Sequence, residues 1–235
     1  MIGSLISDVR DDRRQCTIYR SGDQPEIERW LADHGVATQS RPVPSAWPNP
    51  FLEIRANDEV VGVIGIGAVE GLVEPPIFSP GERNELSEGY RVLFDILEKT
   101  GFSGMSRRDF LAVSREIEDR AFRVGDGTLW VCFQTLSTFR SQTEVYRTLA
   151  AETDLDIHIY GVEDWTPPAI PGITYHTEGA EQFELYWILA YDGGSNETQS
   201  CGLVAEEQSG EYSGFWTNDP TRVEEIISPL TSSCA

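Results

Sequence analysis

Lysine is nearly absent from this chain of 235 residues. Lys99 is the single lysine among 18 basic residues, which face 39 Asp and Glu residues and leave a formal charge of −21. A surface this acidic repels itself in dilute buffer, and salt near 1 M screens that repulsion within about 3 Å. The composition therefore predicts a halophilic protein, with an acidic mesophilic protein as the alternative. The same charge argues against nucleic-acid or anionic membrane partners, an argument that weakens in concentrated salt.

Long apolar runs and paired cysteines are also missing. No stretch reaches about 18 apolar residues, and residues 1–10 lack the basic start and apolar core of a signal peptide. These absences predict a soluble cytoplasmic protein without a membrane partner. Cys16, Cys132, Cys201 and Cys234 lie far apart and form no CxxC pair, which argues against a zinc or redox centre. Because the first three lie in strand-like apolar segments, we expect buried free thiols.

Catalytic motifs are equally scarce. The three histidines are His34, His158 and His176, and the chain has no Gly-x-Ser-x-Gly elbow and no P-loop. His158 and His176 lie in alternating strand patterns, where each is expected to point outward or bond a neighbour. No short spacing brings them to a carboxylate or to Cys132, so the sequence predicts neither a metal site nor catalytic residues. An unrecognised hydrolase or nucleotide-processing enzyme stays open as an alternative to the non-enzymatic functions considered below.

What the chain does contain is enough apolar sequence, 40% of residues, to build a core of helices and strands. The clearest helix covers residues 107–123, with Ser106 as its N-cap, Gly125 as its end signal and Phe110, Val113, Ile117, Ala121 and Val124 on one face. Further helices are predicted at 82–98, 219–228, 25–34 and 139–152. Strands rich in Val, Ile, Thr and aromatic residues are predicted at 15–20, 36–41, 51–55, 60–66, 129–136, 156–160, 173–176, 183–191, 202–206 and 212–217. The pattern predicts an α+β fold with mixed or antiparallel sheets and flanking helices.

The order of these elements contains a loose internal echo. Residues 15–67 give strand, helix, strand, strand, turn and strand, and residues 129–206 give a similar series. If the echo reflects a duplication, it implies two pseudo-repeated lobes; the predicted division is an N-terminal lobe at 1–104 and a C-terminal lobe at 105–235, with one continuous domain as the alternative. Pro75-Pro76 and the stretch 101–104 are the predicted hinges.

Arginines concentrate in the predicted helix at 107–123. This segment holds Arg107, Arg108, Arg115, Arg120 and Arg123 within an otherwise acidic chain. The pairs Glu116–Arg120 and Asp119–Arg123 have the favourable i, i+4 order, so the helix could simply be a self-paired scaffold. The alternative is an anion site at Arg115 or a docking face for a partner formed by Arg108, Arg115 and Arg123.

Tryptophan provides a second set of candidates. Trp130, Trp187 and Trp216 lie in predicted strands, where aromatic walls could hold a planar ligand together with Arg115. The alternative is that these side chains belong to the core.

Several segments taken together resemble the DICT sensory domain of haloarchaeal stand-alone proteins. They are 114–125, 133–137, 145–149, 157–161 and 214–220, and the similarity covers residues 105–230 well and the N-terminal part more loosely. DICT domains accompany diguanylate cyclases and two-component proteins, and the resemblance implies an α+β fold and a sensory role. The family's ligand is not established, so no binding residue and no cofactor can be transferred from it.

These observations predict a non-enzymatic sensory or regulatory protein. It would bind a small ligand or a signalling partner, such as a two-component, cyclic-dinucleotide or transcriptional regulator, and pass its signal by protein contact, because no GGDEF, phosphorelay or kinase motif is found. The alternative is a transcription or two-component adaptor that docks through the helix at 107–123.

Overall fold

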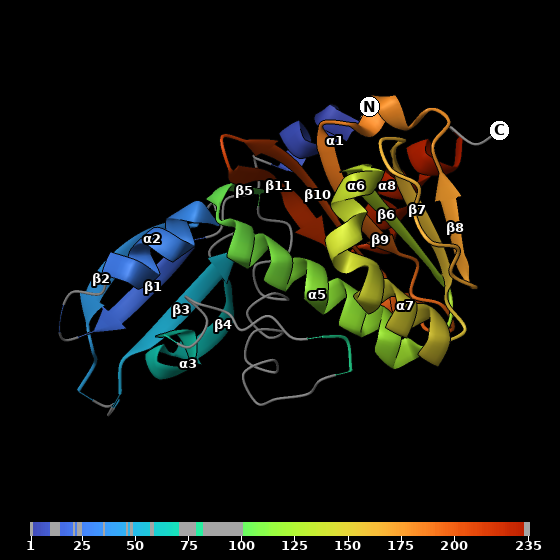
Figure 1. The fold of residues 1–235 in the computed structure, drawn as a ribbon. Coiled ribbons are helices and arrows are strands. Elements are labelled where there is room, and N and C mark those ends of the chain that lie inside the picture. Colours follow the sequence, from blue (N-terminus) through green and yellow to red (C-terminus); the bar gives the residue numbers. More distant parts are fainter. Residues whose placement is uncertain are drawn as a thin grey trace.

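The computed structural model describes residues 2–9, 15–20, 22, 25–34, 36–45, 47, 49–56, 59–70, 79–81 and 101–232. They form two mixed sheets flanked by helices, so the predicted α+β class is confirmed (Figure 1). The helix predicted at 82–98, the Pro75-Pro76 hinge and Cys234 lie outside these residues.

The smaller sheet has four strands in the order β2-β1-β3-β4. Its strands are β1 (Gln15–Arg20), β2 (Ala37–Pro42), β3 (Phe51–Ala56) and β4 (Glu59–Gly65), and α2 (Pro25–Asp33) connects the first two. β1 is parallel to β2 and antiparallel to β3, which is in turn antiparallel to β4. Buried residues from α2, β1 and β3 belong to one apolar cluster, and the short helix α3 (Ile66–Glu70) follows β4.

The larger sheet has seven strands in the order β5-β11-β10-β9-β6-β7-β8. They are β5 (Gly101–Met105), β6 (Thr128–Thr135), β7 (Asp156–Val162), β8 (Ile173–His176), β9 (Tyr186–Tyr191), β10 (Cys201–Gln208) and β11 (Glu211–Thr217). β6, β7 and β8 are parallel to one another, whereas β9, β10, β11 and β5 continue the sheet antiparallel.

Helices cover both faces of the larger sheet. On one face lie α5 (Arg107–Val124), α6 (Leu136–Phe139), the 3₁₀ turn η1 (Arg140–Gln142) and α7 (Thr143–Glu152) (Figure 1). On the other face, α1 (Ile2–Val9) and α8 (Pro220–Ser232) contribute to a second apolar cluster together with η2 (Ala180–Phe183). The result is a three-layer arrangement in which a site can form between the sheet and α5 or α7.

The predicted echo is present in the topology of the two sheets. The order β2-β1-β3-β4 corresponds to β7-β6-β9-β10, with one parallel pair and two antiparallel pairs at matching places. Helices connect the parallel strands in both sheets: α2 lies between β1 and β2, and α6, η1 and α7 lie between β6 and β7 in the chain. The division into lobes at 1–104 and 105–235 stays a prediction, and β5, which spans that boundary, pairs with β11 in the larger sheet.

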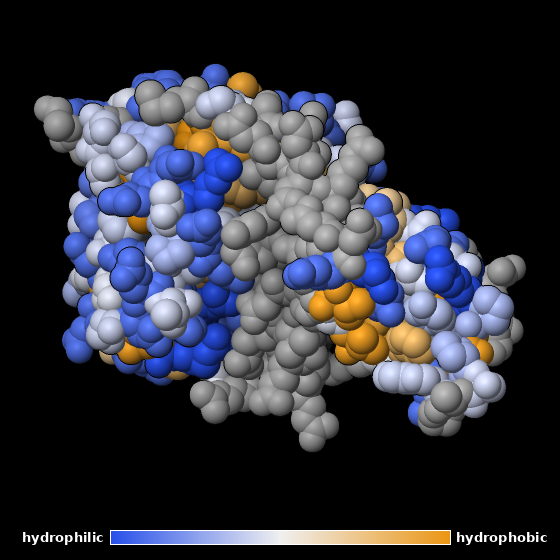
Figure 2. All heavy atoms as spheres, turned by 180° about the vertical axis from the view of Figure 1, so that it is seen from behind, coloured by the Kyte–Doolittle hydropathy of each residue, from blue (hydrophilic) through white to orange (hydrophobic). Residues whose placement is uncertain are grey.

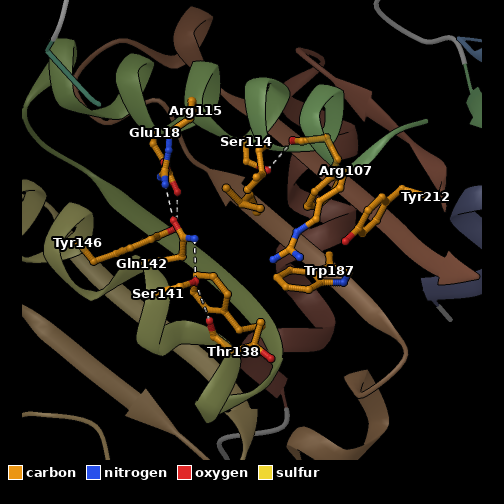
Figure 3. A pocket seen from close by; sticks show the side chains of 14 residues that line it. Arg107, Ser114, Arg115, Glu118, Thr138, Ser141, Gln142, Tyr146, Trp187 and Tyr212 are labelled. Carbon is orange, nitrogen blue, oxygen red and sulfur yellow. Dashed lines mark hydrogen bonds and ion pairs between the residues drawn. The ribbon is translucent and has the colours of Figure 1, made fainter. Parts of the chain in front are cut away.

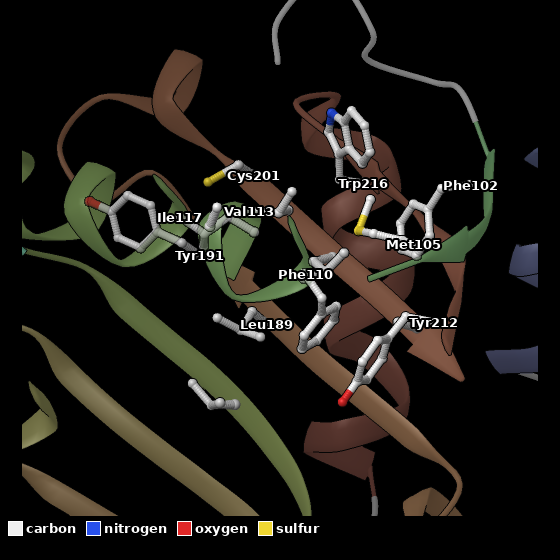
Figure 4. Packing of buried hydrophobic residues seen from close by; sticks show 14 of the residues in the cluster. Phe102, Met105, Phe110, Val113, Ile117, Leu189, Tyr191, Cys201, Tyr212 and Trp216 are labelled. Atoms are coloured by element: carbon white, nitrogen blue, oxygen red, sulfur yellow. The ribbon is translucent and has the colours of Figure 1, made fainter. Parts of the chain in front are cut away.

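Local sequence explains why α5 forms where it does. The Ser106 hydroxyl accepts a hydrogen bond from the Asp109 amide at 3.2 Å, and Gly125 ends the helix in the left-handed conformation at φ 81°. Phe110, Val113 and Ile117 are buried against β9–β11 as their spacing predicts (Figure 4). Removing these side chains from water contributes about 2 kcal/mol each.

Several local predictions were wrong, mostly at the ends of elements; residues 66 and 136, for example, begin α3 and α6 and do not end strands. Residues 101–104, predicted as a hinge, form edge strand β5, and residue 183, predicted to begin a strand, lies in η2. α8 continues through Pro229 to Ser232, although a proline normally ends a helix. Pro229 and Leu230 are buried there, and the Ser232 hydroxyl donates to the Ser228 carbonyl at 2.7 Å, so packing and a side-chain hydrogen bond maintain the last turn.

Aromatic rings join the two sheets. His34, 1% exposed at the end of α2, stacks on Trp30 with centroids 3.9 Å apart and meets the edge of Trp216 from β11 at 5.8 Å. Phe102 of β5 also stacks on Trp216, with ring centroids 5.8 Å apart. Burial lowers the pKa of His34, an effect that its contact with the Trp30 carbonyl and the charge of Asp109 only partly offset. The His34 ring is therefore held uncharged. Burial raises the pKa of Asp33 beside it, and the charges of Asp109 of α5 and Glu211 of β11 lie close enough to raise it further.

The surface differs between the two sheets. Seen from behind, the part built on the seven-stranded sheet is mostly hydrophilic, whereas an apolar patch gathers on the part built on the four-stranded sheet (Figure 2). Val60 and Val63 of β4 are exposed. None of the helices among the described ranges is long and apolar enough to cross a membrane.

Candidate ligand pocket

A narrow pocket lies between α5, the α6-η1-α7 segment and the larger sheet (Figure 3). With its open mouth it encloses about 490 Å³, but its free interior is only about 30 Å³. That interior has room for one or two water molecules. Its lining residues are Arg107, Phe110, Leu111, Ser114, Arg115, Glu118, Phe133, Thr138, Ser141, Gln142, Tyr146, Trp187, Leu189 and Tyr212.

A buried ion pair closes one end of the pocket. Glu118, 2% exposed on α5, accepts a hydrogen bond from the Tyr146 hydroxyl of α7 at 2.6 Å and one from Arg115 one turn earlier. Arg115 also donates to the side-chain oxygen of Gln142, so the cluster ties α5 to η1 and α7. A buried carboxylate needs such partners because burial without them costs several kcal/mol.

The charges of this cluster are fixed by its surroundings. Burial raises the pKa of Tyr146 well above its ordinary value, and the nearby Glu118 carboxylate raises it further. For Arg115, burial would lower the pKa, but attraction to Glu118 outweighs it and the net shift is upward. Tyr146 is therefore a hydrogen-bond donor and Arg115 a cation, and together with Glu118 they form a neutral unit.

Aromatic rings form the opposite wall. Phe110 and Tyr212 stack with centroids 4.3 Å apart and an interplanar angle of 9°, and Trp187 meets the Phe110 ring edge-on at 5.7 Å. Trp187 also lies edge-on to Phe133 at 6.0 Å. The Trp187 indole N–H is buried and has no hydrogen-bond partner in the described part of the structure. A buried donor without an acceptor costs about 1–3 kcal/mol, so this wall offers an unused polar contact.

Arg107 lies at the mouth of the pocket. Its guanidinium extends from the first turn of α5 toward the Trp187 ring (Figure 3). Arg107 is exposed, and among the residues that the structure describes no carboxylate lies within ion-pair distance of it. The mouth therefore presents a positive charge beside an aromatic surface.

The structure brings together only part of the predicted ligand set. Arg115 and Trp187 both line the pocket. Trp130 pairs with Ala190, an odd number of positions from Trp187, so it lies on the other face of the sheet, where it stacks on His158. Trp216 is on the Trp187 face but is 1% exposed at the junction between the sheets. Neither Trp130 nor Trp216 lines the pocket.

The predicted docking arginines are spread along α5. The predicted pairs Glu116–Arg120 and Asp119–Arg123 are present, the first at 3.9 Å, and Arg123 also lies 3.5 Å from Glu116. Arg108 and Arg123 are fifteen positions apart, about 22 Å along the helix axis. A partner that contacts both must therefore cover most of α5, and Arg115 between them is already bound to Glu118.

Most pocket residues were missed from the sequence. Arg107, Leu111, Ser114 and Glu118 follow one another at intervals of four, three and four residues, which places them on one face of α5. This stripe, which is polar except for Leu111, is visible in the sequence. The contributions of Tyr146 and Tyr212 depend on packing between distant segments, for which the sequence has no local signal.

The histidines of β7 and β8 bond one another. His158 Nδ1 lies 2.8 Å from His176 Nε2, and His158 Nε2 lies 3.2 Å from an Asp156 oxygen. Burial and the neighbouring His158 lower the pKa of His176. In the described part of the chain, no three His, Cys, Asp or Glu side chains gather as metal ligands. Cys16, Cys132 and Cys201 are buried free thiols, as predicted.

Comparison with solved structures gives one distant similarity. The crystal structure of polyphosphate kinase from Porphyromonas gingivalis has 12% sequence identity to this chain and a TM-score of 0.42. The alignment covers 98% of this chain and 48% of the kinase chain, so this protein spans about half of the kinase's length. A TM-score of this size is too low to assign a common fold or function. The comparison with curated proteins gave no match.

A family match covers the part of the chain that forms the pocket. Residues 93–208 match the model of the DICT family, described as a sensory domain in diguanylate cyclases and two-component systems. Thirteen of the fourteen lining residues, all except Tyr212, fall within the matched segment. The segment that builds α5, α7 and β6–β10 is therefore similar to a sensory domain, DICT.

Proposed function

We propose that this protein is a non-enzymatic sensory protein whose input site is the pocket beneath α5. The observation that supports it most is the location of the pocket within the segment that matches a sensory family. The pocket combines an aromatic wall with a few polar groups, the composition typical of small-molecule sites. The acidic, lysine-poor composition supports a halophilic, haloarchaeal source for this DICT-like protein.

The small free volume suggests how binding produces a signal. With about 30 Å³ free, the pocket cannot admit an organic ring unless side chains move. The Arg115 contact to Gln142 and the Tyr146 contact to Glu118 link α5 to η1 and α7 across the pocket. A ligand that separates these elements binds the open form more tightly, and this differential affinity shifts the population toward it.

The signal then passes by contact with another chain. α7 is the outer helix that moves most directly with Gln142 and Tyr146, and its opposite face carries the exposed pair Arg147–Glu144. We propose a two-component, cyclic-dinucleotide or transcriptional regulator as the partner. Residues of α5 and α7 that change position on binding would form the contacted surface.

A thermal-shift screen tests the proposal. The purified protein in molar salt is heated with a panel of metabolites and nucleotides, each near 100 times its dissociation constant where that is known. Such saturation stabilises the folded state by about 2.7 kcal/mol, or about 5–10 °C for a chain of this length. The Ser114→Leu variant fills the pocket and should lose the shift, whereas Arg222→Gln on the far face of the sheet should retain it.

Three outcomes would contradict parts of the proposal. If no compound raises the melting temperature and no partner co-purifies, the sensory role is rejected. A shift that persists in Ser114→Leu moves the input site elsewhere. Turnover in an activity screen that one carboxylate or histidine variant abolishes would instead identify an enzyme.

The alternative function is an adaptor that docks through α5. Exposed Arg108 near the start of the helix and Arg123 near its end favour it. Replacing Arg108, Arg115 and Arg123 by Gln should abolish capture of a partner, and the exposed Arg108→Gln change alone should lower stability by less than about 0.5 kcal/mol. Unchanged capture by the triple variant rejects docking through this face, with Arg222→Gln as the matched control.

A further inference from the structure

We propose that the ligand of the pocket is a planar aromatic carboxylate. The inference rests on the proposed sensory function and adds the chemical class of the input. Three properties of the pocket support it: unused hydrogen-bond donors, a net positive charge and flat aromatic walls.

The hydrogen-bond inventory leaves donors in excess. Both oxygens of Glu118 are occupied, by Tyr146 and by Arg115, and the Gln142 oxygen accepts from Arg115. Among the residues that the structure describes, the Trp187 N–H finds no acceptor, and Arg107 forms no hydrogen bond or ion pair. A ligand that satisfies this site must therefore supply acceptors.

The local charge points to an anion. The lining contains two arginines and one carboxylate, a net positive pocket in a chain whose formal charge is −21. Because Arg115 and Glu118 neutralise one another, the unbalanced charge is that of Arg107. A guanidinium binds a carboxylate through two parallel hydrogen bonds, which also selects a planar group. In molar salt the screening length falls to about 3 Å, so only a direct contact of this kind retains its strength.

The walls select a flat apolar body. Phe110 and Tyr212 are stacked, and the Trp187 ring stands at 66° to Phe110, so a ring that enters beside Leu111 meets faces and edges of aromatic side chains. Offset-stacked and edge-on contacts of this type contribute beyond the burial of apolar area. A ring placed against Trp187 brings its carboxylate toward Arg107 at the mouth (Figure 3).

Three probes of equal size separate these requirements. Benzoate has both the ring and the charge, benzamide has the ring without the charge, and cyclohexanecarboxylate has the charge without a planar ring. Binding is measured by calorimetry in the full chain at two salt concentrations. We expect benzoate to bind at least about tenfold more tightly than benzamide, the factor that one charge-assisted hydrogen bond provides. It should bind at least about threefold more tightly than cyclohexanecarboxylate, which keeps the charge but loses the contacts between aromatic rings.

Variants locate the contact. Arg107→Gln should weaken benzoate binding about tenfold and leave benzamide unchanged, whereas Arg222→Gln removes the same charge from α8 and should change neither. Trp187→Phe keeps an aromatic ring and removes the N–H, and should weaken benzoate about fivefold. Melting temperatures of the unliganded variants show whether each is folded.

Each contrary outcome overturns the ligand class. Benzamide binding as tightly as benzoate, equal effects of Arg107→Gln and Arg222→Gln, or no binding by any aromatic acid would each reject it. A neutral compound could instead raise the melting temperature in the broad screen, with no such shift in the Ser114→Leu variant. That result would support the sensory function and reject the aromatic carboxylate as its ligand. If benzoate does not bind and no compound in the broad screen raises the melting temperature, both the ligand class and the sensory function are rejected.

Discussion

Arg115→Met is the most informative single change in this protein. Arg115 and Glu118 have side chains 13% and 3% exposed, and Glu118 has no other cationic partner among the described residues. The variant leaves the Glu118 carboxylate buried with the Tyr146 hydroxyl as its one remaining partner. Breaking a buried pair from one side costs about 3–5 kcal/mol. For a chain of this length the melting temperature should fall by about 6–20 °C.

The triple variant Arg115→Met, Glu118→Leu, Tyr146→Phe replaces all three partners of the buried cluster with apolar side chains. Because it leaves no buried charge and no unpaired hydroxyl, it should recover most of the stability lost by the single change. Urea unfolding followed by circular dichroism gives the free energies. Arg147→Gln, which breaks the exposed pair with Glu144, should cost less than about 1 kcal/mol and is the matched control. The reasoning is refuted if Arg115→Met costs no more than Arg147→Gln, or if the triple variant is as unstable as the single one.

Three other regions give independent predictions. A Cβ on Gly214 would lie 1.9 Å from a carbonyl oxygen of β10, so Gly214→Ala should lower stability by about 2 kcal/mol or more in thermal unfolding, whereas Gly67→Ala, with nothing within 4 Å, should change it far less. Burial raises the pKa of the Cys16 and Cys132 thiols to about 12, so iodoacetamide at pH 8 should label them only as fast as the protein unfolds, and faster labelling seen by mass spectrometry would contradict their burial. Burial lowers the pKa of His34, so below about pH 6.5 the unfolded chain takes up a proton that the folded chain does not, and stability should fall on acidification; His34→Gln should flatten this slope in urea unfolding between about pH 7.5 and 5.5, and an unchanged slope would contradict the assignment.

Sequence patterns were sufficient for elements whose signals are local. α5 begins and ends at its predicted caps, and β1 and β8 have the predicted bounds, because capping and alternation act over a few residues. β5 was missed because two glycines in its five residues resemble a flexible stretch, whereas pairing with β11 decides its conformation. α1 was not predicted, since eight residues give too short a periodic pattern and burial of Ile2 and Ile6 stabilises it.

The candidate site was predicted less completely than the fold. Arg115 and Trp187 were chosen as residue types suited to a ligand, and both line the pocket. Trp130 lies on the other face because strand register determines the face of every side chain, and register is a property of two strands. Tyr146 and Gln142 reach Glu118 and Arg115 through packing of α7 and η1 on α5, which no local pattern encodes.

The rings at the meeting of the two sheets set how the molecule responds to its solvent. The rings of Trp30, His34 and Trp216 form an apolar contact there. Changing the ionic strength alters the mutual repulsion of the surface carboxylates, and it also acts on this junction, where burial and the charges of Asp109 and Glu211 raise the pKa of Asp33. Excluded salts strengthen such apolar contacts. Diluting the salt should therefore weaken this junction in two ways, through weaker apolar contact and stronger repulsion among its carboxylates, so that the two sheets loosen together with the acidic exterior.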